Sequence, residues 1–340
     1  KKETEEAFRT VVSRIEEKKS AAEANLIYSD NEQARVVLNE AMSLLETLVP
    51  DGNNQEGEIQ RLKEEINVVL ASLQGIQQVA VTSLADLSVI DSSAYFTNSI
   101  SVGGKIYAVT NGQALYSYND LEQSWKNENS IAGSIGSVVK VTNHDSGFLF
   151  LDNNQRLGRA SLTNNTLNPI VSGVESMPSV ESIASYNGNV YALSSQAQQI
   201  IKMQPQGDGF DAGTNWIKAK DADLSTARSL TIDGDIYVLT NNSVVKFTTG
   251  AEQSFTLDTI DPALSNPTQI WTSANDDFLY ILDKAEGRII VFEKNGNFVT
   301  QYVSENFKEA TSFTVQGDKK TIYVVTATQL FSFTADHLLQ

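Results

Sequence analysis

Cysteine is absent from the 340 residues, and histidine occurs only twice, at positions 144 and 337. Without cysteine the chain cannot form disulfide bonds, thiol nucleophiles, or zinc and iron–sulfur sites with thiolate ligands. Two histidines are too few for a metal site with several imidazole ligands, and we interpret His144, within Asn143–Gly147, as part of a solvated hairpin turn. No Asp-x-Asp-x-Asp-Gly calcium loop is present. We therefore expect no metal site and no cofactor.

Positive charge and long apolar runs are also scarce. The 25 basic residues face 42 acidic ones, which gives a formal net charge of −17. We exclude nucleic acid as a partner, because its binding depends on Lys and Arg side chains that neutralise phosphates. No apolar stretch approaches the roughly 18 residues needed to span a bilayer, so we predict no membrane span in this chain. Because the chain starts at Lys1 without a methionine and the heptad spacing is already present at Phe8, we expect a piece of a longer protein. Whether an anchor lies upstream is left open by the sequence.

Motifs of catalysis are missing as well. Neither a Gly-x-Ser-x-Gly nucleophile elbow nor a phosphate-binding loop occurs in the sequence. Carboxylates such as Asp233 and Asp235 stand in predicted hairpin turns, where Asp is favoured for local hydrogen bonds. We therefore predict no catalytic residue and no enzymatic activity.

Residues 1–78 have the heptad spacing of helices that pack along narrow apolar seams. The breaks fall near residues 28–32 and at Pro50–Asn54, so we predict a three-helix segment of helical-hairpin or coiled-coil-like character. It is either a small bundle or stalk, or a module for self-association or peptide binding. The seam positions are Phe8, Val11, Ile15 and Ala22, then Ala34, Val37, Ala41, Leu44 and Leu48, then Ile59, Leu62, Ile66, Val69, Leu73 and Ile76.

The rest of the chain repeats one pattern six times, most clearly in Thr231–Gly250. An alternating apolar run ends in Asp-Gly, Ile-Tyr-Val-Leu follows, and a Thr-Asn-Asn-Ser turn leads to Val-Val-Lys-Phe. These are three short strands joined by tight turns. A repeat of 42 to 46 residues with room for four strands is typical of a propeller. The second strand recurs at Ile106–Val109, Phe148–Leu151, Val190–Leu193, Ile236–Leu239, Leu279–Leu282 and Ile322–Val325.

We therefore predict a mainly β fold, with a six-bladed β-propeller over residues 79–340. Fourth strands are weaker, for example Ser254–Leu257 in the fourth repeat. The sixth repeat has no room for one after Phe333. We expect the β-leaning segment Val79–Ile90 to supply this outer strand, which would join the two ends of the ring and leave no open edge.

Three resemblances follow from these motifs. Tyr191-Ala192-Leu193, the run Gln199–Met203 and Trp216-Ile217 resemble the blades of NHL-repeat propellers, whose members include scaffolds, peptide or RNA binders, hydrolases and lyases. The segment Ala34–Glu46 resembles one helix of a tetratricopeptide repeat. A helical segment followed by a propeller is also similar to the outer part of bacterial membrane-anchored chains whose N-terminal portion resembles a PPM-type phosphatase.

Superposing the predicted inner strands places six small polar residues at equivalent positions around the channel. Since six strands converge at the axis, such residues fit there for geometric reasons alone. Alternatively they bind a ligand, together with Arg228, Trp271 and Tyr95 at one mouth. The six residues are Ser99, Ser137, Ser182, Ser229, Gln269 and Ser312.

From these patterns we expect a non-catalytic binding or interaction domain outside the cytoplasm, on a bacterial cell surface. Its partner would be a protein, a peptide or a polar small molecule, and the helices would allow self-association. Two alternatives remain. One is the sensor ectodomain of a signalling chain of the phosphatase-like kind, and the other is a metal-dependent propeller hydrolase or lyase.

Overall fold

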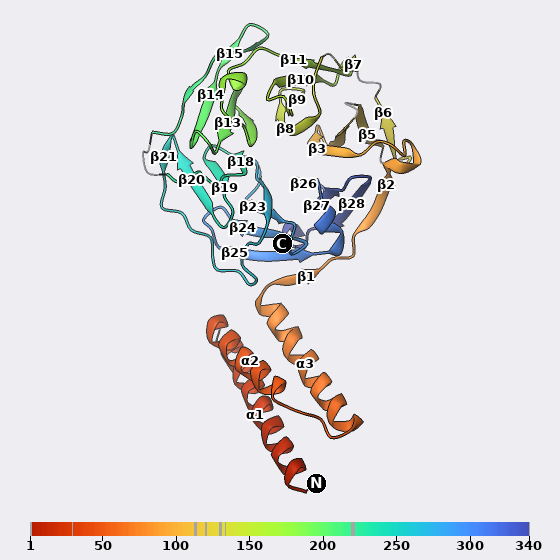
Figure 1. Ribbon diagram of the computed structural model, residues 1–340, viewed down its shortest axis with the longest axis vertical. Coiled ribbons are helices and arrows are strands. Elements are labelled where there is room, and N and C mark those ends of the chain that lie inside the picture. The colour runs from red at the N-terminus through yellow and green to blue at the C-terminus, as the bar shows by residue number, and fades with distance from the viewer. Residues whose placement is uncertain are drawn as a thin grey trace. The chain divides into compact units, whose positions relative to one another are not determined.

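The computed structural model describes residues 2–28, 30–111, 114–119, 121–128, 131–132, 134–218 and 222–339. The chain forms two compact units, residues 1–77 and 78–340. The first unit is helical and the second consists almost entirely of strands and turns (Figure 1).

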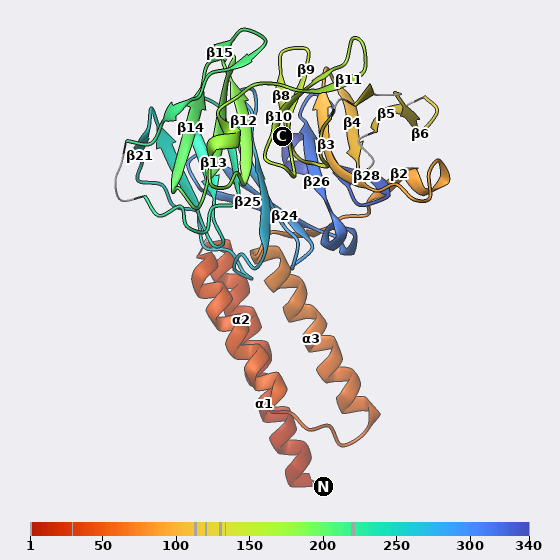
Figure 2. The same cartoon turned by 45° about the horizontal axis from the view of Figure 1, so that its top comes forward.

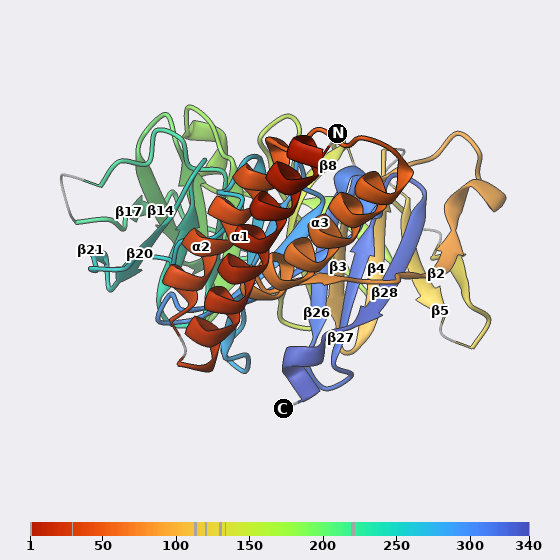
Figure 3. The same ribbon diagram turned by 90° about the horizontal axis from the view of Figure 1, so that it is seen from below.

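Three helices make up the first unit and lie side by side (Figure 3). Helix α2 begins after Asp30, whose carboxylate accepts the backbone N–H of Gln33 at 3.1 Å and so caps the helix. Helix α3 begins after Gly52, which has a φ of 108° that favours glycine. In the described part of the chain, no helix is both long and apolar enough to cross a bilayer. The helices are α1 (Lys2–Ile27), α2 (Asn31–Glu46) and α3 (Asn53–Leu73).

The helical unit has its own apolar core, drawn from the predicted seams or from positions next to them. Exposed ion pairs, such as Arg9 of α1 with Glu58 of α3 at 3.0 Å, lie outside this core. Such pairs contribute little, so burial of the apolar side chains holds the helices together. The buried side chains are Phe8, Val12, Ile15, Ala22, Ala34, Leu38, Ala41, Leu45, Leu62 and Ile66.

The second unit is the six-bladed β-propeller that the repeat predicts (Figures 1 and 2). Each blade has four antiparallel strands in order from the axis outwards. The innermost strands are β3 (Phe96–Val102), β8 (Val138–His144), β12 (Ser182–Tyr186), β18 (Ser229–Ile232), β22 (Pro267–Trp271) and β26 (Ser312–Gln316). The second strands are β4 (Lys105–Thr110), β9 (Gly147–Asp152), β13 (Asn189–Ser194), β19 (Ile236–Leu239), β23 (Phe278–Asp283) and β27 (Thr321–Val325).

The outer half of each blade is shorter and less regular. Extra strands are β1 (Ile76–Gln78), β7 (Ile131–Ala132), which runs parallel to β11, and the hairpin of β15 (Pro205–Gln206) with β16 (Gly209–Phe210). The third strands are β5 (Leu115–Asn119), β10 (Leu157–Ser161), β14 (Gln199–Met203), β20 (Val244–Thr248), β24 (Arg288–Glu293) and β28 (Gln329–Thr334). The fourth strands are β6 (Ser124–Asn127), β11 (Thr166–Pro169), β17 (Thr214–Asn215), β21 (Ala251–Glu252), β25 (Phe298–Val303) and β2 (Thr82–Asp86).

The fourth strand predicted at Ser254–Leu257 is not present. Strand β21 ends at Glu252, and the chain then leaves the blade edge. Asp258 binds the next blade instead: its N–H donates to Gly296 O at 2.9 Å, and its carboxylate accepts from Phe298 N–H at 2.9 Å. Hydrogen bonding to the neighbouring blade has replaced strand pairing within the blade.

The ring closes through β2, which pairs antiparallel with β28 in the sixth blade. Two residues of this segment, Ala85 and Leu87, are buried in the adjoining core. Residues 82–86 and 329–332 therefore share one sheet, and the outer edge of the last blade is covered.

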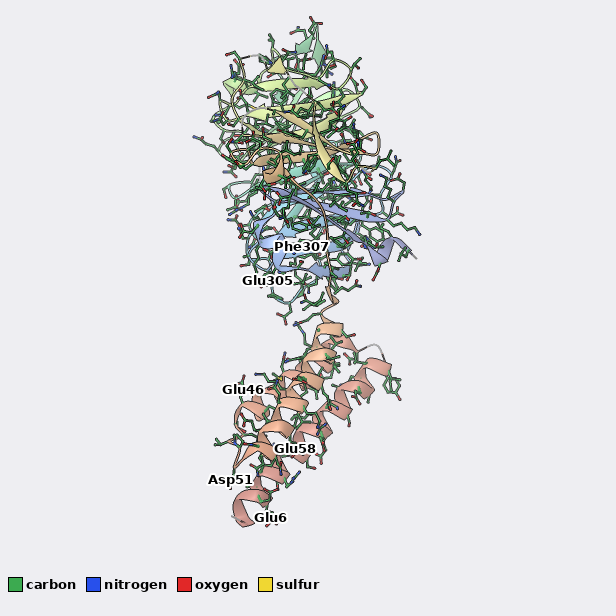
Figure 4. All side chains as sticks on the ribbon, turned by 90° about the vertical axis from the view of Figure 1, so that its right-hand side faces the viewer. Glu6, Glu46, Asp51, Glu58, Glu305 and Phe307 are labelled. Carbon is green, nitrogen blue, oxygen red and sulfur yellow. The ribbon has the colours of Figure 1, made fainter. Side chains whose placement is uncertain are left out.

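Apolar clusters fill the spaces between neighbouring blades. The cluster between the fifth and sixth blades includes Tyr280, Phe313 and Phe307. Phe307 comes from the short helix η3 (Glu305–Glu309), which buries this ring while Glu305 stays exposed (Figure 4). Because each blade packs on the next, the inner strands are held in place around the channel.

Candidate functional site: the central channel

The channel contains a cavity of about 550 Å³, lined by residues from all six inner strands. Its walls carry many hydroxyl and amide groups, including those of Thr142, Ser185 and Thr314. A cavity of this volume is in the range of small-molecule sites in proteins. The channel is therefore the part of the propeller to test for a ligand.

Strand register defines one equivalent position in each blade, which we call the ring position. It is the inner-strand residue that faces the last residue of the repeated second-strand run, as Ser182 faces Leu193. Register irregularities in β3 and β8 shift the pairing there, so the ring residue is one position earlier than Ser99 and three positions later than Ser137. The ring residues are Asn98, Lys140, Ser182, Ser229, Gln269 and Ser312.

The candidates predicted from the sequence do not all reach the cavity. Those that line it are Ser99, Ser182, Ser229, Gln269 and Trp271, whereas Ser137, Arg228 and Ser312 do not. Trp271 lies two residues beyond the ring position, and its indole packs edge-on against Tyr280 at 5.5 Å. Tyr95 is half exposed and outside the cavity lining. Arg228 and Trp271 therefore stand at different heights along the channel.

Most ring residues join one blade to the next. Ser182 Oγ accepts the N–H of Leu230 at 3.2 Å, and Ser229 Oγ accepts that of Ile270 at 3.3 Å. In the same way Gln269 Oε1 accepts the N–H of Phe313 at 3.1 Å, and Ser312 Oγ accepts the N–H of Ser99 at 3.0 Å. In each case the donor is the residue that follows the ring position of the next blade. Because this shift of one residue repeats, the inner strands of these blades run in one direction and begin at the same mouth. The hydroxyls predicted as ligand groups are thus largely engaged in holding the ring together.

Lys140 departs from this pattern. Its ammonium can only donate, so it cannot accept an N–H from the third blade as Ser182 does from the fourth. Within the described residues its side chain forms no hydrogen bond and no ion pair, and it lines the cavity. Burial among the channel walls lowers the pKa of Lys140, and the carboxylate of Glu181 opposes this shift. Sequence reasoning missed this residue, because the bulge in β8 is not visible without its partner strand.

Acidic groups at the mouth where the inner strands begin are already engaged. Glu181 accepts hydrogen bonds from Ser179 Oγ, Ser195 Oγ and Ser195 N. Asp283 forms an ion pair with Arg288 at 2.9 Å and accepts a backbone N–H from the loop that precedes β22. Asp152 forms an ion pair with Arg156 at 2.8 Å. These carboxylates are satisfied without a cation from the channel.

Two further cations lie at the same mouth. Lys284 follows the end of β23 and lines the cavity, and it forms no ion pair in the described part of the chain. Arg228 precedes the ring position in β18 and donates to the side-chain oxygens of Asn241 and Asn266. Both of these partners are neutral, and Arg228 forms no ion pair with any described residue. In a chain with a net charge of −17, Lys284 and Arg228 bring positive charge to this mouth, and Glu181, whose hydrogen-bond partners are also neutral, offsets it in part.

His144 is not in a solvated turn, contrary to the interpretation from the sequence. It ends β8, its side chain is only 6% exposed, and the ring packs edge-on against Phe210 at 5.7 Å. One ring nitrogen lies 2.7 Å from the hydroxyl of Ser185, which lines the cavity, and the other lies 3.3 Å from Asp145. Burial lowers the pKa of His144, so the imidazole is neutral at pH 7 and one of its nitrogens can accept a proton.

No group of three or more His, Cys, Asp or Glu residues in the described ranges is arranged to hold a metal ion. The walls of the cavity present hydroxyls, amides, the side-chain amines of Lys140 and Lys284, and the His144–Ser185 pair.

No protein-family model matches the sequence, and no curated protein matches it. Solved structures match in fold. Virginiamycin B lyase from Staphylococcus aureus has a TM-score of 0.51 at 14% identity, over 74% of this chain and 98% of that chain. An auxiliary nutrient-binding protein from Bacteroides ovatus has a TM-score of 0.51 at 12% identity, over 74% of this chain and 76% of that one.

A third similar structure is the extracellular domain of BT4673 from B. thetaiotaomicron, described as a hybrid two-component system. Its TM-score is 0.52 at 10% identity, over 77% of this chain and 43% of that chain. At these identities the likeness shows the propeller fold alone. The resemblances to NHL repeats and to a tetratricopeptide helix stay predictions.

Proposed function

We propose that this chain is a non-catalytic binding domain that acts outside the cytoplasm of a bacterial cell, and that its central channel takes a small polar ligand. The observation that carries this proposal is the cavity of about 550 Å³ with polar walls, together with cations at its mouth that form no ion pair among the described residues. Loops and strand ends from several blades meet there, as they do at many binding sites.

The similar structures support the location and the class of function without deciding either. One is the extracellular domain of a protein described as a two-component system, and another is a nutrient-binding protein. Both descriptions suit a domain that takes up a molecule from outside the cell.

The test is calorimetric titration of the purified chain with polar probes: acetate, succinate, glucose, inorganic phosphate and a tetrapeptide. Thr268 lines the cavity and is half buried, so Thr268→Trp should fill the channel and abolish binding. The matched control is Leu121→Trp, at a position that is 97% exposed, which should bind as the unchanged chain does. Binding that survives Thr268→Trp would place the site elsewhere, and absence of binding by every probe would contradict the proposal.

A sensor ectodomain is the first alternative, and the similarity to BT4673 favours it. It differs from a plain binding domain in one measurable respect, because ligand binding to the propeller of a sensor must change the helical unit. Hydrogen exchange of α1, α2 and α3 with and without the bound probe separates the two. Unchanged exchange in the helices supports a binding domain, and altered exchange supports a sensor.

A metal-dependent hydrolase or lyase is the second alternative, and the similarity to virginiamycin B lyase favours it. Elemental analysis of the purified chain distinguishes the two classes. One equivalent of a bound divalent metal per chain would support the enzyme and count against the proposal.

Self-association through the helices stays a separate proposal. Val36 and Val68 are 40% and 69% exposed on α2 and α3, and light scattering of the full chain would show whether such positions pair between copies.

A further inference from the structure

We infer that the channel binds its ligand through a carboxylate group, and that Lys140 is the residue that holds this group. The inference deepens the channel-binding function proposed above and rests on it.

The first argument is the position of Lys140. In four other blades the ring residue accepts an N–H from the next blade, and Asn98 donates its side-chain amide to Val139 O at 2.7 Å. Lys140 can accept nothing and donates to no described atom, so it takes no part in joining the blades. A residue that departs from a repeated structural pattern without a structural gain indicates a functional role.

The second argument is the charge of Lys140. Lys140 is partly buried, and even partial loss of an ammonium's hydration costs free energy unless a counter-charge or hydrogen bonds replace it. Glu181 is the acidic group that acts on Lys140, but its oxygens already accept from Ser179 and Ser195 and it forms no ion pair with the lysine. Among the described residues the Lys140 ammonium therefore has no hydrogen-bond acceptor, and its charge is opposed only by Glu181, without an ion pair. A bound anion would supply both an acceptor and the counter-charge.

The third argument concerns the kind of anion. Phosphate carries up to two charges and is usually held by several donors, often bidentate Arg. At the ring position Lys140 offers a single ammonium. Lys284 also lines the cavity but follows β23 at the mouth, and Arg228 does not line the cavity. One ammonium matches the single charge of a carboxylate. Neutral groups on the same walls, such as the hydroxyls of Thr268 and Thr314, would bind the uncharged remainder of the ligand.

The route to Lys140 is also suited to an anion. Arg228 and Lys284 stand at the mouth where the inner strands begin, one step before the ring position. Their positive charge favours approach of an anion to a chain that is otherwise strongly negative.

The experiment uses the full chain labelled with ¹³C at lysine Cε, with the Lys140 signal assigned by its absence in Lys140→Met. Acetate and succinate are added, then inorganic phosphate, and acetamide serves as a neutral isostere of acetate. We expect a saturable shift of the Lys140 signal with the carboxylates and none with acetamide. Lys140→Met should weaken binding of the best carboxylate at least tenfold. Lys63→Met, at an exposed lysine in α3, should leave that affinity unchanged.

The possible failures are distinct. If a probe binds the channel, is blocked by Thr268→Trp, and binds Lys140→Met equally well, the role of Lys140 is overturned while channel binding stands. If phosphate binds more tightly than every carboxylate, the ligand class is overturned. If no probe binds the unchanged chain, the proposed function fails and this inference fails with it.

Discussion

Gln269 and the backbone of Phe313 hold two neighbouring blades together through a pair of hydrogen bonds. The side-chain Nε2 donates to Phe313 O at 3.0 Å, and Oε1 accepts from Phe313 N at 3.1 Å. This is the most complete of the contacts that join ring residues to the next inner strand. It shows that a polar residue in the channel can serve the fold and still line the cavity.

Replacing Gln269 by methionine should therefore destabilise the propeller. The change keeps the side-chain length but leaves the N–H and C=O of Phe313 without their partners, at a cost of about 1–3 kcal/mol. Urea unfolding of the full chain measures this, with Gln253→Met at an exposed position as the control. Equal stability of both variants would mean that water replaces the lost bonds and that the contact adds nothing.

Lys140→Met should act in the opposite direction and raise the free energy of unfolding, by roughly 1 kcal/mol. The folded pKa of Lys140 lies below its unfolded value near 10.5, so the unfolded state binds more protons between these two values. The cost of the charged lysine is therefore fully present at lower pH and is relieved as pH rises through that window. The measurement is the stability difference between the two proteins at pH 7 and at pH 10.

A smaller difference at pH 10 is the expected result. A variant that is less stable than the unchanged chain at pH 7 would show that Lys140 has a structural partner. In that case the Lys140 ammonium would already be paired within the fold and would not be free to bind a ligand.

His337 should make the propeller sensitive to mild acid. Its ring nitrogens lie 2.8 Å from the hydroxyl of Tyr302 and 3.0 Å from that of Tyr280, and burial lowers the pKa of His337 to about 4. Because Tyr280 donates to Asp276, it accepts from Nε2–H, which leaves Nδ1 as the acceptor for Tyr302. A proton on Nδ1 would break this chain of hydrogen bonds.

The folded pKa of His337 is below the unfolded value of about 6.5, so stability is lost as pH falls from about 6.5 to about 4. Over the whole window the loss amounts to about 3 kcal/mol. The pKa of Asp276 is raised by burial, which opposes this trend, but the residue is present in both proteins compared. Chemical unfolding of the unchanged chain and of His337→Gln across this pH range gives the difference. Parallel pH profiles would contradict the assignment.

Closure of the ring by β2 predicts that a chain starting at Ala94 is less stable and prone to associate. That chain lacks the partner of β28 and the buried side chain of Leu87, so the sixth blade has an open edge. Thermal unfolding and light scattering test both effects. The expectation fails if the shortened chain stays monomeric and melts at the same temperature.

Ile66→Asp should unfold the helical unit, because Ile66 is fully buried in its core and a carboxylate there has no partner. The cost is several kcal/mol, enough to unfold a small unit. Circular dichroism should report loss of helix while the propeller keeps its own melting transition. Loss of both units in one transition would show that they fold as one.

The sequence alone determined the propeller, because its signals are local. Alternating apolar residues and turn residues such as Asp233-Gly234 specify short strands and hairpins, and a regular repeat leaves few other ways to arrange them. The absence of cysteine and the scarcity of histidine likewise limit the chemistry that the chain can perform, since composition alone removes thiolate and multi-imidazole sites.

Only the tertiary structure decided which residues face one another across the channel. Irregular pairing in β3 and β8 moved the ring position from Ser99 and Ser137 to Asn98 and Lys140, and a bulge depends on a partner strand that the run itself does not encode. The two histidines are buried for the same kind of reason. His337 is enclosed by Tyr280 and Tyr302, which are distant in sequence. Tertiary packing, and not the local sequence pattern, therefore sets the protonation of the two histidines.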